Sequence, residues 1–181
     1  MFLDRKGIAA LEFALLAPLL AAISVGLVET VLLVRADMLL NFVTTETAQI
    51  IGSKVGPVLH KSEIVDTCFG ARLTMRSYDT SSLSMAIMSA TNDVTKGQIK
   101  VWEVDNACPT AYPALGTPPQ LAKDLMPKAG DNVIYVEASY VYPAMFPQIT
   151  GTITLSHNAP YQLIHFPSTG SSNGTLSCDN C

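Results

Sequence analysis

The sequence has few charged residues and no excess of basic ones. Charged side chains make up 14% of the 181 residues, and eleven Lys and Arg stand against fifteen Asp and Glu, which gives a net charge of −4. A nucleic-acid-binding domain needs a basic surface, so we expect no nucleic-acid partner. Disordered tails and coiled coils are rich in charge, so a chain with this composition fits neither class.

The sequence also lacks the common catalytic and ligand-binding motifs. It contains no Gly-rich phosphate loop, no Gly-x-Ser-x-Gly and no His-Glu-x-x-His, and its histidines and cysteines do not follow the spacing of a zinc site. Cys178 and Cys181 have the spacing of a redox motif, but this segment offers no helix N-terminus that would activate a thiolate. We therefore expect no enzyme activity, no metal and no cofactor.

What the sequence does contain is one long apolar run, from Ile8 to Val34. All but six of its 27 residues are apolar. As a helix the run would be about 40 Å long, more than the hydrocarbon core of a bilayer. Arg5 and Lys6 precede it, so the positive-inside rule predicts a cytoplasmic N-terminus and a single crossing of the membrane.

Two carboxylates, Glu12 and Glu29, interrupt the apolar run. A charged group in a membrane segment is costly and indicates a function by default. Glu12 is the sharper case because it is only the fifth residue of the run, although its side chain could instead reach back to the cytoplasmic headgroups. For Glu29 we expect a position near the outer interface of the membrane.

The residues around Glu12 follow a recognisable order. Arg5-Lys6 precedes Gly7, four residues follow, and then come Glu12 and the aromatic Phe13. This order resembles the processing motif of type IV prepilins. With its apolar continuation, it is similar to the TadE/TadF-like minor pilins (pseudopilins) of tight-adherence (Flp, type IVc) pili.

That resemblance implies cleavage between Gly7 and Ile8 by a prepilin peptidase. It also implies that Glu12 and Phe13 take part in subunit assembly, with Glu12 pairing with the new Ile8 amine of a neighbouring subunit. The partners implied are lipid of the bacterial inner membrane, other pilins and the tight-adherence secretion machinery. The C-terminal domain would lie in the periplasm and could enter the pilus.

Two other interpretations remain open at this stage. An ordinary signal peptide could be cleaved near Ala22-Ile23-Ser24 and would leave Val25 at the N-terminus, but Glu12 and the continuing apolar run disfavour it. Alternatively, the chain could be a periplasmic binding or scaffold domain on a simple signal-anchor helix, with no part in a pilus.

Beyond the run, helical spacing continues to Ile51, so we expect one long helix from Ile8 to Ile51. A second helix is expected from Ser62 to about Tyr78. Four segments with period-2 alternation then predict an antiparallel sheet with one buried face. The expected strands are 83–89, 98–104, 132–142 and 152–157.

The sequence therefore predicts an α+β fold: a long N-terminal transmembrane helix, a further helix and a four-stranded antiparallel sheet, as in pilins. A Pro-rich loop over 107–130 should cross the sheet, with one helical turn at 120–126. The expected division is a leader (1–7), a transmembrane helix (8–34), its extramembrane continuation (35–56), the α+β domain (57–167) and a flexible Ser/Gly-rich tail (168–181).

The four cysteines are all expected outside the cytoplasm, where disulfides form. Four cysteines allow three pairings, and the sequence does not choose among them. One pairing joins Cys68 to Cys108 and Cys178 to Cys181, and the others would tie the tail to the domain.

Overall fold

The computed structural model describes residues 5–54, 58–163, 177–179 and 181, with the backbone alone for residues 5–10 and 149. In chain order the helices and strands are α1 (Arg5–Gly52), β1 (Val58–His60), α2 (Lys61–Thr74), the 3₁₀ turn η1 (Thr80–Ser82), β2 (Ser84–Asp93), β3 (Gly97–Val104), α3 (Gln120–Asp124), β4 (Asn132–Tyr142), α4 (Pro147–Thr150), β5 (Ile153–Gln162) and β6 (Ser177–Asp179). The α+β class is confirmed.

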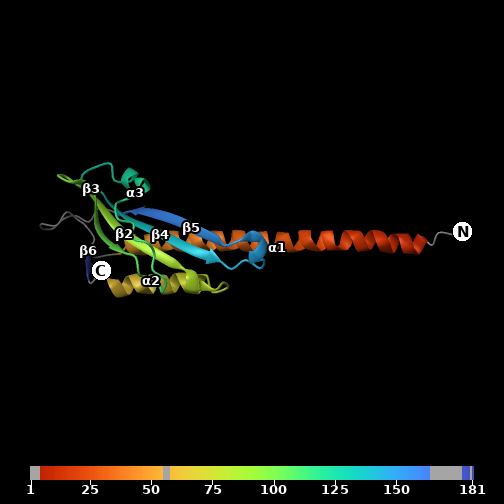
Figure 1. Ribbon diagram of the computed structural model, residues 1–181. Helices are drawn as coiled ribbons and strands as arrows, with labels where there is room; N and C mark the ends of the chain where they lie inside the picture. Colours follow the sequence, from red (N-terminus) through yellow and green to blue (C-terminus); the bar gives the residue numbers. More distant parts are fainter. Residues whose placement is uncertain (1–4, 55–57, 164–176, 180) are drawn as a thin grey trace.

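A single helix, α1, runs along most of the length of the molecule (Figure 1). It continues through Pro18, which lies in the apolar half, and ends at Gly52. A Cβ at Gly52 would overlap the ring of Tyr161 on β5, so glycine allows the helix end to approach the sheet. The expectation of one long helix is confirmed.

The four long strands form one antiparallel sheet in the order β3-β2-β4-β5. β4 is the longest strand, and its ends coincide with the predicted segment 132–142. A tight turn joins β2 to β3. The side chain of Asp93 accepts hydrogen bonds from the backbone N–H groups of Thr95 and Lys96, and Gly97 takes a positive φ of 72°.

The outer half of α1 and all of α2 pack on one face of this sheet, and together they form the main core. Figure 1 shows the strands lying alongside the outer half of α1, while the N-terminal half extends beyond them. Fully buried members of this core include Leu40 of α1, Ile64 of α2, Met85 and Ile87 of β2 and Tyr140 of β4. We call the sheet, α2 and the segments packed on them the head.

Over β2 and β4 the other face of the sheet is covered as well, so the expectation of one buried face is wrong for these central strands. Met88 and Ala90 of β2 and Val133 of β4 pack against Ala122 and Met126. The covering residues come from α3 and the segment after it, within the Pro-rich loop. The loop crosses the sheet with a helical turn, as predicted, and that crossing is what buries the second face.

The second helix is shorter than predicted. α2 begins at Lys61 instead of Ser62, because the Glu63 carboxylate accepts a hydrogen bond from the backbone N–H of His60 at 2.7 Å and caps this end. It ends at Thr74, and Met75, which follows it, is fully buried. Tyr78, expected at the end of the helix, lies beyond it, and its side chain contacts α1.

Part of the predicted tail is ordered. Residues 168–176 lie outside the described residues, but Ser177–Asp179 forms β6, which pairs in parallel with β1. The tail therefore returns to the segment that follows α1, at the end of the head farthest from the N-terminus (Figure 1).

Candidate functional site: the junction of the apolar helix and the head

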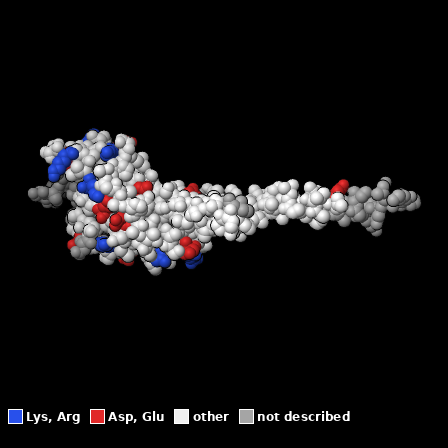
Figure 2. Space-filling model, viewed as in Figure 1, with Lys and Arg blue, Asp and Glu red and all other residues white. Residues whose placement is uncertain are grey.

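The N-terminal half of α1 has no packing partner among the described residues. From residue 11 to residue 28 nearly every side chain is exposed, including Phe13 at 70%. A window of this helix has a mean hydropathy of 2.2, and the helix is long and apolar enough to span a membrane. Figure 2 shows this extension as almost free of charge, with one acidic patch near its N-terminal end.

That acidic patch matches Glu12, the one charged residue between positions 7 and 28. Glu12 is exposed and makes no hydrogen bond or ion pair within the described part of the chain. Gly7 and Ile8 lie in the first turns of α1, where only the backbone is described. The spacing of Ile8 and Glu12, four residues apart, places them on neighbouring positions of one helix face.

Glu29 is in a different situation, because the head covers it. Its side chain is only 8% exposed. The backbone N–H of Met145, in the loop between β4 and β5, donates a hydrogen bond to Glu29 Oε1 at 3.1 Å. Glu29 Oε2 is buried and makes no hydrogen bond within the described part of the chain. Glu29 is thus a contact between the apolar helix and the head, which the expectation of a simple interfacial residue did not include.

Two more polar contacts join α1 to the head just above Glu29. The Tyr78 hydroxyl donates to the backbone carbonyl of Leu32 at 3.0 Å. One turn further, Asp37 Oδ1 lies 2.8 Å from His157 Nε2 on β5. Glu29, Leu32 and Asp37 span less than three turns, so these three polar contacts lie close together along α1, below the apolar core contacts of its outer half.

Aromatic side chains surround these contacts. The ring of Tyr78 packs at 6.5 Å from that of Tyr140 in an edge-to-face arrangement and at 6.4 Å from that of Tyr142. Burial raises the pKa of Tyr140 to about 12. Burial, and then the nearby Glu29, also raise the pKa of Tyr142. These hydroxyls therefore stay protonated at neutral pH and act as neutral polar groups.

A groove of about 620 Å³ opens below this junction, between α1 and the loop that contains α4. Its lining is mostly apolar and holds no basic residue; it comprises Ala21, Ala22, Val25, Gly26, Glu29, Thr30, Leu33, Phe146, Thr150 and Ile153. A smaller cavity of about 420 Å³ lies higher, between α1 and α2.

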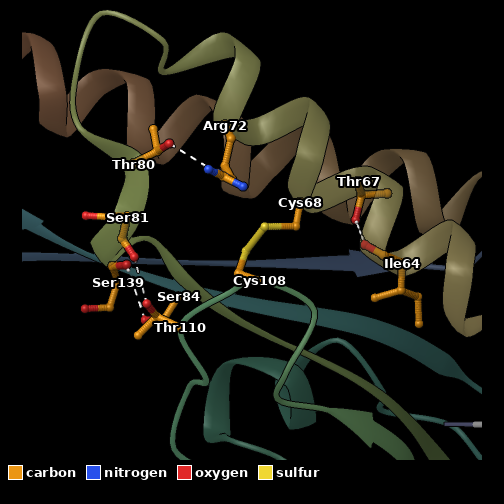
Figure 3. Close-up of a disulfide and its surroundings, with 10 residues drawn as sticks. All are labelled: Ile64, Thr67, Cys68, Arg72, Thr80, Ser81, Ser84, Cys108, Thr110 and Ser139. Atoms are coloured by element: carbon orange, nitrogen blue, oxygen red, sulfur yellow. Dashed lines mark hydrogen bonds between the residues drawn. A yellow bond between two sulfur atoms is a disulfide. The ribbon is translucent and has the colours of Figure 1, made fainter.

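One disulfide cross-links two segments of the head. Cys68 of α2 and Cys108, which follows β3, are joined with their Cα atoms 5.5 Å apart. Both cysteines are buried. Figure 3 shows the bond linking α2 to the loop that crosses the sheet, with the Arg72 guanidinium donating to Thr80 Oγ1 one turn further along α2.

The other two cysteines pair within the tail. Cys178 and Cys181 form the second disulfide, with Cα atoms 5.6 Å apart. Oδ2 of the neighbouring Asp179 lies 3.3 Å from Nδ1 of His60, across the β1–β6 pair. Of the three pairings left open by the sequence, the structure contains the one that closes the tail on itself.

The described residues contain no group of three His, Cys, Asp or Glu side chains that could hold a metal ion. No family model, curated protein or solved structure matches the chain. Of the residues singled out from sequence, the structure brings the cysteines together in pairs but gives Glu12 and Phe13 no partner among the described residues. Sequence reasoning missed the role of Glu29, because Met145 lies 116 residues away.

Proposed function

We propose that the chain is a TadE-like minor pilin, which takes part in the assembly of a tight-adherence pilus after a prepilin peptidase removes the leader 1–7. The main observation behind the proposal is the exposed carboxylate of Glu12 on the apolar half of α1. The same helix continues without a break into the outer half, on which the head packs. A simple membrane anchor requires an apolar helix but does not require a carboxylate such as Glu12 within it.

The physical argument concerns the cost of that charge in lipid. A carboxylate in the hydrocarbon region loses hydration, and an opposite charge nearby offsets part of the cost. Cleavage after Gly7 would create such a charge, the ammonium of Ile8. Because the described part of the chain gives Glu12 no partner, the ammonium of a neighbouring subunit is the partner we propose. The pairing would favour one register between two helices.

The disulfide between Cys68 and Cys108 supports the proposed orientation. Disulfides persist in the periplasm and outside the cell, and they are rare in the cytoplasm. The head carries this disulfide, while Arg5 and Lys6 lie on the other side of the apolar run. Both features favour a cytoplasmic N-terminus and a periplasmic head in the inner membrane.

The first test is the mature N-terminus of the membrane-bound protein, read by mass spectrometry. We expect a chain that begins at Ile8 in cells with the peptidase and an uncleaved chain in cells without it. A chain that begins at Val25 would instead indicate an ordinary signal peptide. An uncleaved chain in both strains, with normal piliation when the gene is deleted, would support the alternative of a periplasmic binding or scaffold domain on an anchor.

The second test addresses Glu12 itself. Glu12→Ala should leave processing and membrane insertion largely intact but abolish assembly, because the charge pair is lost. Leu16→Ala is a matched control, since Leu16 lies one turn further along the same face and is also exposed. Normal numbers of pili in the Glu12→Ala cells would show that the pairing is wrong.

A further inference from the structure

The groove below the head has a polar end and an apolar end. Glu29 and Thr30 lie toward the head, just below Leu33 and Ile153 at the upper end, whereas Val25, Ala22 and Ala21 lie one to two turns closer to the N-terminus. In a membrane crossed by α1, the polar end is at the outer interface and the apolar end faces the hydrocarbon. This is the polarity of a single phospholipid in the outer leaflet, with its headgroup outward and its acyl chains inward.

The carboxyl group at the polar end has an unused acceptor. Met145 donates to Oε1 of Glu29, but Oε2 is buried without a hydrogen bond. The hydroxyl of Tyr142 is close enough to Glu29 for the carboxylate, after burial, to raise its pKa, but it does not reach Oε2 at the distance and angle of a regular hydrogen bond within the described part of the chain. A buried acceptor without a donor is costly, so a rotation of the Glu29 carboxylate that turns Oε2 into the groove, toward a cationic donor, would be favoured.

The groove wall also contains a glycine, Gly26, at a position where packing within the described part of the chain would allow a larger side chain. Gly26 lies mid-helix, where glycine costs about 1 kcal/mol relative to alanine. A Cβ at this position would meet nothing within 4 Å, so no intramolecular contact explains the glycine. The missing side chain widens the groove beside Glu29.

We infer that this groove binds one phospholipid whose headgroup carries a primary ammonium, with the ammonium at Glu29 and an acyl chain along Ala22 and Gly26. The inference rests on the proposed membrane span of α1. Because no basic residue lines the groove, it offers nothing to the phosphate of an anionic lipid and favours a zwitterionic one.

A helix from a second copy of the chain is the competing occupant, and the shape of the groove disfavours it. At the upper end Leu33 and Ile153 both pack against the main core, so the groove stops where β5 meets α1. A helix that continued outward beside α1 would run into the head at this point. A lipid ends at its headgroup and fits the closed end.

The test uses the full chain, reconstituted in vesicles with equal parts of phosphatidylethanolamine, phosphatidylcholine and phosphatidylglycerol carrying the same acyl chains. After extraction in a mild detergent, native mass spectrometry counts the lipids that stay bound. We expect about a tenfold preference for phosphatidylethanolamine over phosphatidylcholine, the effect of one hydrogen bond to a charged group. The choline headgroup has the same charge but no N–H, so this pair isolates the hydrogen bond.

Two variants locate the site, each with a control. Glu29→Gln should abolish the preference while the amide oxygen still accepts the Met145 hydrogen bond, and Glu12→Gln should keep it. Gly26→Leu should reduce the retention of all three lipids by filling the groove, and Ala14→Leu, on the exposed helix outside the groove, should not. Unchanged fluorescence of Trp102 in the head would confirm that each variant is folded.

Three results would overturn the inference: equal retention of the three lipids, a preference that survives Glu29→Gln, or a second protein chain retained in place of lipid. An alkaline carbonate wash distinguishes a failure of the lipid-binding inference from a failure of the proposed function. If the wash removes the protein from vesicles, the membrane span is wrong and both proposals fail. If the protein stays but shows no lipid preference, only the lipid site is wrong.

Discussion

The two halves of α1 are built from similar residues and have opposite surroundings. Leu20 in the N-terminal half is 58% exposed, whereas Leu40 in the outer half is fully buried against the sheet. Both lie in one continuous helix and are the same residue type. The difference is therefore not local: it comes from the strands and the second helix, which cover one half and leave the other bare.

This comparison indicates that stability and assembly can be studied separately. The outer half is stabilised by the core of the head, so substitutions there should change the free energy of unfolding of the head. Under the proposed function the bare half lies in lipid or against a partner, so substitutions there should change insertion and assembly. Trp102, the only tryptophan, lies in β3, and its fluorescence therefore reports unfolding of the head alone.

The largest expected effect is the loss of the disulfide that braces the head. Replacing Cys68 and Cys108 together by alanine should lower the free energy of unfolding of the head by about 4 kcal/mol, because the bond closes a loop with a sequence separation of 40. Urea unfolding in detergent, followed by Trp102 fluorescence, measures this loss. Replacing Cys178 and Cys181 by serine opens only a short loop and should cost about 2 kcal/mol or less. Equal losses for the two pairs would contradict the prediction.

The sharpest test of the comparison is a matched pair of leucines. Leu40→Ala removes a fully buried side chain and should cost about 3 kcal/mol. Leu20→Ala makes the same chemical change on the bare half and should leave the unfolding of the head unchanged. The same urea experiment measures both variants. A loss of stability in Leu20→Ala would mean that the N-terminal half contributes to the head after all.

A smaller effect is expected at the junction itself. Tyr78→Phe removes the hydroxyl that donates to the Leu32 carbonyl and should cost about 1 kcal/mol. Tyr161→Phe is the control, because Tyr161 is half-buried but its hydroxyl makes no hydrogen bond to the described residues. The urea midpoints of the two variants should therefore differ, and equal midpoints would show that the Tyr78 bond adds nothing.

The smallest expected effect is pH-dependent and lies far from the junction. Hydrogen bonds from the Thr95 side chain and from the backbone of Lys96 and Thr95 lower the pKa of Asp93 from 3.8 to about 2. This carboxylate therefore stabilises the β2–β3 turn above pH 3.8, and the stabilisation is lost as the pH falls through about 2. The urea midpoints of the parent and Asp93→Asn should differ at neutral pH and converge on acidification. A gap that is constant with pH would contradict this assignment.

Elements with a strong repeating pattern could be predicted from the sequence. β4 coincides with the predicted strand because Ile134, Val136 and Ala138 face one side and alternate with Tyr135 and Glu137. α1 was also predicted within a few residues, because its apolar and helical spacing continue without a break. In both cases the local pattern and the tertiary surroundings agree.

The features that could not be predicted depend on contacts between segments that are distant in the sequence. The second buried face of the sheet requires Met126 to cross over β2, and nothing near Met88 indicates this. The three-residue strand β6 has no pattern of its own and exists through pairing with β1. Glu29 could be recognised from sequence as unusual, but its burial depends on the loop at Met145.

The position of the head along α1 has a mechanical consequence. The helix extends about 30 Å from Leu33, at the junction, to its end at Gly52. Because the sheet packs along this length, the outer half of α1 and the head would tilt together with the bare half. A change of about 10° in the tilt of the bare half would move the far tip of the head by about 5 Å, given a rigid helix of this rise.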